Sequence, residues 1–268
     1  MYIVADIGGT KTRIAGSPDM ESFSKPVIYE TPKKYEDAIE FFSTVVRTVA
    51  GGSVVKGAVV GKPKPLWKEH ENFATELGAL INTPVRVEND TALVGLGEAV
   101  YGAGKGSDIF VYITVSTGVG GVRITGGRID RSWQGFEIGG QYLTIDHPIS
   151  LEDLISGSAV HKHYGVHPKE LGKDHPVWEE EARVLAHGLH NTILHWSPDR
   201  VALGGSMFND IGISVDRVRY HVAALMKKFP MVPEIVHSSL GDIGGLWGGL
   251  ALLRQGYEGQ ARLKQLRS

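Results

Sequence analysis

Apolar and polar residues follow two different periods along this chain, and each stretch of one period predicts an element. Residues 2–7 form a short apolar run, a Gly-Gly pair follows, and residues 11–15 return as a second run, which is typical of a β-hairpin. From Tyr35 to Val49 the apolar residues recur at every third or fourth position, which predicts an amphipathic helix. The same criteria predict strands at 2–7, 11–15, 27–29, 57–60, 85–87, 109–115, 122–124, 128–129, 201–203 and 235–237, and helices at 35–49, 73–81, 90–100, 151–155, 176–196, 211–229 and 246–255.

The same order of elements occurs twice. A β-hairpin, a strand, a helix, a strand and a helix occupy residues 1–108, and the series restarts at residue 109 with longer insertions. We therefore predict an α/β protein of two lobes, residues 1–108 and 109–245, in which a duplicated β-hairpin/βαβ core leaves a cleft between the lobes. A helix from about residue 246 to 268 is expected to pack back onto the first lobe. Ligands of α/β proteins collect beyond the carboxyl ends of the strands, so the site is expected there.

Composition and charge narrow the classes of function. The chain has no cysteine, which excludes disulfides, thiolate metal sites and a cysteine nucleophile. A formal net charge of −2 provides no electrostatic footprint for nucleic acid or for an anionic membrane, so we expect small-molecule partners. The first residues show neither a basic leader nor a long apolar run, so we expect a cytoplasmic protein.

Glycine is unusually frequent and gathers at strand ends. There are 35 glycines in 268 residues, about 13%, against a usual share of roughly 7%. Two of the clusters interrupt predicted hairpins, at Asp6-Ile7-Gly8-Gly9-Thr10-Lys11-Thr12 and at Ser116-Thr117-Gly118-Val119-Gly120-Gly121. Such turns let backbone N–H groups face an anion, so both are candidate phosphate sites, although ordinary hairpin turns have the same composition. The second does not fit the dinucleotide fingerprint, because its third glycine position is Arg123.

Three further segments carry candidate chemistry. Asn89-Asp90 stands where a strand ends and a helix begins, so Asp90 is a candidate general base, although Asn and Asp are also common helix caps. Glu137 and Glu152 are candidates for binding a polyol, with solvated surface carboxylates as the alternative. Gly204-Gly205-Ser206 follows a strand and either approaches a nucleoside or forms a simple turn. The spacing of His161, His163 and His167 does not predict a metal site.

Together these segments resemble the ROK family of sugar kinases and sugar-responsive repressors, which has the two-lobed actin-like (ribonuclease H-like) ATPase fold. The resemblance covers nearly the whole chain. The segments that carry it are Asp6 to Lys11, Glu88-Asn89-Asp90 with Gly97-Glu98, Tyr101 to Gly106, Thr117 to Gly120, and Gly204-Gly205-Ser206.

The resemblance implies a role for each matching residue. Asp90 would remove the proton from a sugar hydroxyl, commonly the 6-hydroxyl, and Asn89, Glu137, Glu152 and Asn72 would hold other hydroxyls. Asp6 would help to place Mg²⁺ through its water. ATP would be held at Gly8, Gly9, Thr10, Lys11, Thr117, Gly118, Gly204 and Gly205. The protein would then be an ATP-dependent kinase of a hexose or hexose derivative.

The chain departs from the family pattern at the sugar side. The family's Gly-Glu-x-Gly-His reads Phe136-Glu137-Ile138-Gly139-Gly140 here, and the cysteine-rich segment of its zinc site is missing. We therefore expect no zinc site, and a loop from Gly140 to Leu151 that is held by something else. The usual Pro-Gly-Pro loop reads Gly61-Lys62-Pro63-Lys64-Pro65, and Ser116 stands where glycine is usual.

Several alternatives stay open. A polyphosphate-dependent glucokinase of the same fold and a catalytically inactive sugar sensor both share these motifs. A repressor is disfavoured, because the first phosphate loop begins at residue 6 and leaves no room for a DNA-binding domain before it. The sequence does not name the sugar, and it leaves a homodimer open.

Overall fold

The computed structural model describes residues 1–265, with side chains described to residue 256. The strands are β1 (Tyr2–Ile7), β2 (Lys11–Ser17), β3 (Val27–Glu30), β4 (Gly57–Lys62), β5 (Val85–Asn89), β6 (Ile109–Val115), β7 (Val119–Thr125), β8 (Arg128–Ile129), β9 (Arg200–Gly204) and β10 (Glu234–His237). The helices are α1 (Tyr35–Ala50), α2 (Phe73–Ile81), α3 (Asp90–Tyr101), α4 (Leu151–Ile155), α5 (Gly157–Tyr164), α6 (Val177–Trp196), α7 (Val215–Leu225) and α8 (Gly244–Gln265).

The chain divides into two compact units. Unit 1 contains Met1–Gly97 and the chain from Asp242 onward, and unit 2 contains Glu98–Gly241. Helix α3 therefore begins in unit 1 and ends in unit 2, and α8 belongs to unit 1. Each unit is built on its own five-stranded mixed sheet.

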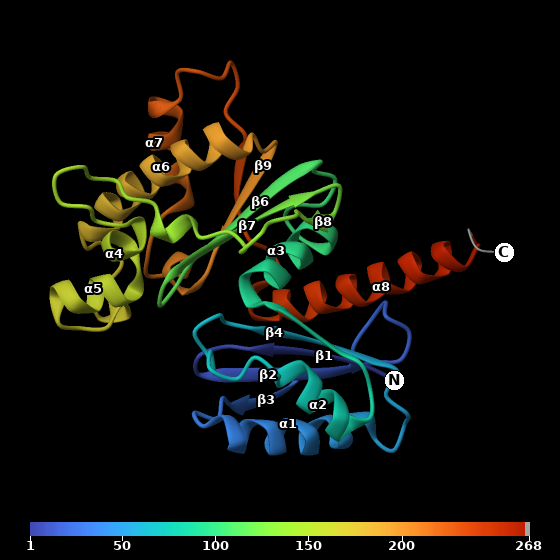
Figure 1. Ribbon diagram of the computed structural model, residues 1–268. Coiled ribbons are helices and arrows are strands. Elements are labelled where there is room, and N and C mark those ends of the chain that lie inside the picture. The colour runs from blue at the N-terminus through green and yellow to red at the C-terminus, as the bar shows by residue number, and fades with distance from the viewer. Residues whose placement is uncertain (266–268) are drawn as a thin grey trace. The chain divides into compact units, whose positions relative to one another are not determined.

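The sheet of unit 1 has the order β3-β2-β1-β4-β5. The β1–β2 hairpin is antiparallel, whereas β4 and β5 run parallel to β1. Alternate residues of β1 face opposite sides of the sheet: Ile3, Ala5 and Ile7 pack with α1 and α2, and Val4 packs with Leu246 and Leu250 of α8. Figure 1 shows α1 and α2 on one face of this sheet and α8 on the other.

The sheet of unit 2 repeats this topology. Its order is β10-β9-β6-β7-β8, with β6–β7 antiparallel and with β9 and β10 parallel to β6. β6 therefore takes the place of β1, β7 that of β2, and β9 that of β4. The duplicated hairpin-plus-βαβ core that the sequence predicts is confirmed.

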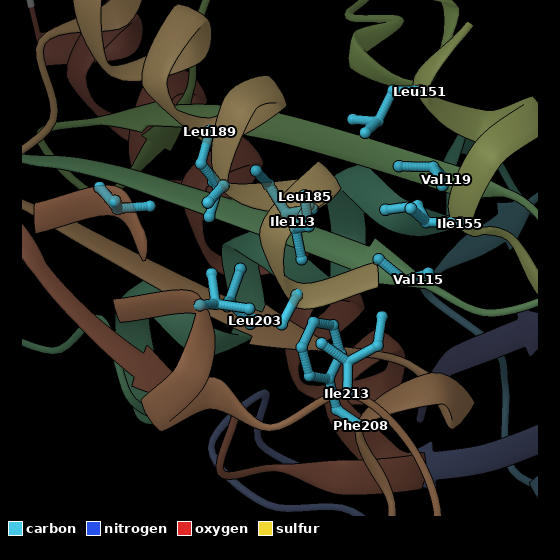
Figure 2. Packing of buried hydrophobic residues seen from close by; sticks show 14 of the residues in the cluster. Ile113, Val115, Val119, Leu151, Ile155, Leu185, Leu189, Leu203, Phe208 and Ile213 are labelled. Carbon is cyan, nitrogen blue, oxygen red and sulfur yellow. The ribbon is translucent and has the colours of Figure 1, made fainter. Parts of the chain in front are cut away.

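The hydrophobic core of unit 2 lies between one face of this sheet and the helices α4, α6 and α7. Leu185 and Leu189 of α6 are fully buried beside Ile113 of β6 (Figure 2). The other labelled members of this core are Val115, Val119, Leu151, Ile155, Leu203, Phe208 and Ile213. Burial of large aliphatic side chains of this kind stabilises a fold by about 1.5–3 kcal/mol each.

The structure differs from the sequence prediction mainly at helix ends. α5 was not predicted, because Ser156-Gly157-Ser158 has a turn-like composition, yet the Ser156 side chain caps it by accepting the N–H of Ala159. α7 is shorter than the predicted 211–229, because Ser214 caps its start and the backbone is already extended at Met226. The last helix is longer than the predicted 246–255. The predicted range 246–268 ends at residues 266–268, which lie outside the described residues.

The loop that follows Gly140 is held by backbone hydrogen bonds. The N–H of Leu143 donates to the carbonyl of Ile149 over 3.0 Å, and that of Leu151 donates to the carbonyl of Gln141 over 2.9 Å. The hydroxyl of Thr144 closes the tip on the carbonyl of His147. Residues 141–151 thus form a small hairpin.

Candidate functional site

The turn between β1 and β2 carries the first predicted phosphate loop. Three carbonyls of this turn are bound by the segment that follows β3. The hydroxyl of Thr31 donates to the carbonyl of Gly8 (2.7 Å), and the N–H of Thr31 donates to the carbonyl of Thr10 (2.9 Å). The Lys33 ammonium donates to the carbonyl of Gly9 (2.9 Å). A side chain at Gly8 would lie 3.0 Å from the carbonyl oxygen of Lys11, which explains the first glycine. The Gly8 N–H is used inside the turn, where it donates to the carbonyl of Lys11 over 2.9 Å, so the candidate donors to a ligand are the N–H groups of Gly9 and Thr10.

Asp6 stands at the carboxyl end of β1, opposite Arg13 of β2 and Gly61 of β4. Its carboxyl group is tightly packed, because a Cβ on Gly245, at the start of α8, would lie 2.7 Å from its Cγ. Burial above all, and then the negative charge of Asp90, raise the pKa of Asp6 to about 7, while the Arg13 guanidinium opposes this shift.

Asn89 and Asp90 lie where β5 meets α3, and their side chains make different hydrogen bonds. Asn89 caps the helix, since its Oδ1 accepts the N–H of Ala92 over 3.0 Å. Oδ1 of Asp90 accepts from Nδ2 of Asn89 (3.1 Å) and from the N–H of Thr91 (2.7 Å). Burial raises the pKa of Asp90, and its hydrogen bond to the Thr91 N–H and the charge of Lys62 oppose the rise.

The two acids of unit 1 are neighbours across Gly61. A Cβ placed on Gly61 would lie 3.5 Å from Oδ1 of Asp6 and 3.5 Å from Cα of Asp90. The structure therefore brings together the residue predicted to place Mg²⁺ and the residue predicted to act as base. Asn72 is an exposed residue just before α2 whose carbonyl accepts the N–H of Glu76.

The second predicted phosphate loop, in unit 2, lies between β6 and β7 and is bound to α4 and α5. The N–H groups of Gly157 and Ser158, at the start of α5, donate to the carbonyls of Ser116 (2.7 Å) and Thr117 (3.3 Å). Oε2 of Glu152 accepts the N–H of Val119 over 2.7 Å. A Cβ on Gly118 would lie 2.5 Å from that oxygen, so a side chain there would displace the Glu152 carboxylate. Glu152, predicted to hold a sugar hydroxyl, thus contacts the phosphate loop directly.

The Gly204-Gly205 turn lies against the same end of β6. Gly205 has a φ of +97°, and a Cβ there would lie 2.3 Å from the carbonyl oxygen of Val115. A cavity opens beside this turn and the second phosphate loop. It is lined by Ser116, Thr117, Gly157, Ser158, His161, His167, Pro168, Lys169, Ser206, Met207 and Ile211. Its lining combines hydroxyls and basic groups with apolar surface, which suits a nucleoside as well as phosphate.

Glu137 lies in a different surface pocket of unit 2, beside Phe136, Gln141 and Trp196. Gly139, two positions after Glu137, must be glycine, since a Cβ there would lie 2.3 Å from the carbonyl oxygen of Val119.

Two features of the site were not identified as functional from the sequence. Lys62 lies at the end of β4 beside Asp90. Ser158 and His161 line the cavity beside the Gly204-Gly205 turn. Lys62 could have been identified as an unusual charge in the altered Pro-Gly-Pro loop. Ser158 and His161 lie on the helix that the sequence did not predict, and His161 was considered only as a metal ligand.

Among the side chains of residues 1–256, no three His, Cys, Asp or Glu come together as a metal site would require. Within residues 1–265, no helix combines the length and the apolar character that crossing a membrane requires.

Comparison with known proteins identifies the family of this chain. The family model described as ROK family matches residues 2–256. The glucokinase of Streptomyces coelicolor is 33% identical over 95% of this chain and 98% of its own, and the fructokinase of Pediococcus pentosaceus is 29% identical over 73% of each. The crystal structure of a ROK family glucokinase from Streptomyces griseus, in complex with glucose and AMPPNP, has a TM-score of 0.78 at 22% identity, covering 95% of this chain and 99% of that one. At this identity the structural match shows the shared fold.

Proposed function

This chain belongs to the ROK family, and on that premise we propose that it transfers the γ-phosphoryl group of ATP to the 6-hydroxyl of a hexose or hexose derivative. The protein is a carbohydrate kinase, that is, a phosphotransferase with an alcohol group as acceptor. We propose the identity of the donor, the phosphorylated hydroxyl and the role of each residue.

The arrangement around Asp90 carries the proposal. Asn89 provides the helix cap, which leaves the Asp90 carboxylate for chemistry. In the proposed step the acceptor oxygen attacks the γ-phosphorus, its proton passes to Asp90, and the bond from the γ-phosphorus to the bridging oxygen breaks to release ADP. Burial raises the pKa of Asp90, and a more basic carboxylate accepts a proton more readily.

The donor is proposed to be ATP because a mixed polar and apolar cavity adjoins the second phosphate loop. Thr117 and Gly118 would hold phosphate, and Gly204 and Gly205 would border the nucleoside in the cavity that Met207 and Pro168 line. In unit 1, Gly8 to Lys11 would bind phosphate through N–H groups and the Lys11 ammonium. An inorganic polyphosphate chain has no apolar group that could pack against the apolar part of that cavity.

Asp6 fits a role beside Mg²⁺. Burial and the neighbouring Asp90 charge disfavour its ionised form, so a divalent cation nearby would stabilise that form. Asp6 would hold the ion through its water, and the ion would offset phosphate charge when bound.

The acceptor is proposed to be bound by Asn89, Glu137 and Glu152, with Asn72 as a further candidate. Carboxylates and amides suit this task because each binds hydroxyl groups in a fixed direction. Since Oε2 of Glu152 accepts from Val119, its Oε1 is the atom proposed for the sugar.

A coupled nucleotide-release assay across hexoses, amino sugars and N-acetylated sugars tests the proposal, with ATP and polyphosphate as alternative donors. We expect ATP-dependent phosphorylation of at least one hexose-type sugar. Turnover with polyphosphate alone would replace the donor, and sugar binding without turnover from any donor would identify an inactive sensor.

A further inference from the structure

Lys62 occupies an unusual position for a lysine, since it ends a central strand next to the two acids of unit 1. It is the last residue of β4 and pairs in register with Asn89 of β5, the residue before Asp90. Its side chain is half-buried. Burying an ammonium group is costly unless it gains hydrogen bonds and a negative charge nearby.

The Lys62 ammonium closes the turn that follows it. It donates to the carbonyl of Pro63 over 3.3 Å and to that of Leu66, while the N–H of Leu66 also donates to the carbonyl of Pro63. An ammonium group has three N–H donors, so these two bonds leave one for another acceptor. The Pro63–Leu66 turn is thus organised around the lysine side chain.

The far end of the same turn is held by Trp67. This residue has a φ of +51°, a conformation that a bulky residue rarely adopts, and such strain persists only where the surroundings hold it. Its ring is 9% exposed among Phe42 and Phe73, and its Nε1–H donates to the carbonyl of Lys33. Anchoring at both ends makes this a rigid turn at the edge of the site.

Charged groups of neighbouring strands act on the two acids. Lys62 of β4 contributes a positive charge near Asp90. Asp90 in turn contributes a negative charge near Asp6 of β1, on which Arg13 and Asp242 also act. The attraction between Lys62 and Asp90 also offsets part of the cost of burying the ammonium group.

We propose that Lys62 is a positioning residue for the acceptor end of the site: it shapes the Pro63–Leu66 turn and keeps a positive charge beside the Asp90 carboxylate. This inference rests on the proposed role of Asp90 as general base. The cation keeps Asp90 ionised, and therefore able to accept a proton, although a second carboxylate lies close by.

Lys62→Met and Lys62→Arg test this inference, with Lys56→Met, at the exposed opposite end of β4, as the matched control. We expect Lys62→Met to lower kcat/KM for the sugar at least about tenfold and to leave the KM for ATP within about twofold. The acid limb of its kcat profile should move to higher pH, because removal of a nearby cation favours the neutral acid. Lys62→Arg should restore most of the activity and the original profile.

A ¹³C NMR titration of the Asp90 carboxyl group provides a readout that needs no turnover. It should show the same upward shift in Lys62→Met, whether or not a sugar substrate has been found, and so separates failure of this inference from failure of the proposed function. If the Asp90 titration and the pH profile of Lys62→Met equal those of Lys56→Met, the inference is overturned. If Lys62→Met does not fold, the same titration on Lys62→Gln decides the question.

Discussion

Asn89 donates from Nδ2 to Oδ1 of Asp90 over 3.1 Å, while its own Oδ1 accepts the N–H of Ala92. One side chain therefore both begins the helix and orients the acid that follows it. This arrangement resolves the ambiguity of an Asn-Asp pair at a helix start, because the cap and the candidate base are different residues.

Asp90→Asn should lower turnover at least about a hundredfold, the usual scale for loss of a general base, while sugar binding stays measurable by calorimetry. The amide oxygen can still accept from Asn89 and Thr91, so the helix start should be preserved. The exposed first-turn acid of α1 provides the control Asp37→Asn, which should leave both quantities unchanged. Near-normal turnover in Asp90→Asn would exclude Asp90 as the base.

Asp6→Asn should reduce turnover and raise the Mg²⁺ concentration needed for half-maximal rate, without loss of folding stability. The pKa of Asp6 is about 7 in the fold against an ordinary value of 3.8, so the native protein retains a proton that the unfolded chain releases. Stability contributed by this group therefore falls as pH rises from about 4 to 7, and the substitution should remove that slope. A Mg²⁺ dependence equal to that of the native enzyme would contradict the assigned role.

Glu98→Gln should lower the free energy of unfolding by about 2–3 kcal/mol. The Glu98 side chain, in a residue 1% exposed, accepts the N–H groups of Ala103, Ser239 and Leu240, each over 2.8 Å, and the Ser239 hydroxyl over 3.1 Å. A glutamine has one acceptor oxygen and would turn an NH₂ group toward donors. Urea denaturation measures the change.

The surface variant Glu234→Gln is the control for Glu98→Gln. Glu234 is ion-paired with Arg200, and its side chain is 58% exposed. Exposed ion pairs of this kind contribute about 0–1 kcal/mol, so the two variants should differ clearly. Equal effects would mean that the hydrogen bonds of Glu98 contribute little to stability.

Glu181→Gln should make the protein more stable at pH 8 than the native chain and change its stability less at pH 5. Glu181 is 2% exposed on α6, and neither of its oxygens has a hydrogen-bond partner among the described residues. Burial raises its pKa to about 8 from an ordinary 4.5, so native stability should fall as pH rises between these values, by an amount on the order of 4 kcal/mol, and level off above.

Denaturation of the native and Glu181→Gln chains at pH 5, 6.5 and 8 checks this. The neighbouring Glu180 is exposed and paired with Arg183, so Glu180→Gln is a matched control that should stay within about 1 kcal/mol of the native chain at each pH. Native and Glu181→Gln curves that run parallel across this range would refute the prediction.

The strands, most of the helices and the duplication could be predicted from the sequence. They follow from local information: nearly continuous apolar runs along β1 and β6, three-to-four spacing along α1 and α6, and glycine where a turn must pass close to another chain segment. Strand ends and glycine turns are also local features, so Asp6, Asp90, Thr117 and Gly118 could be named as candidate site residues from the sequence.

Which of these residues lie in contact depends on the tertiary fold. Asp6 and Asp90 are 84 positions apart in number, and their proximity depends on β1 and β5 flanking β4 in one sheet, with Gly61 between them. The contact of Glu152 with the second phosphate loop, the closure of the Pro63–Leu66 turn by Lys62, and the burial of Glu181 without a partner likewise depend on packing. Local propensity carries no information on such contacts, because burial and electrostatic environment are set by residues that are distant along the chain.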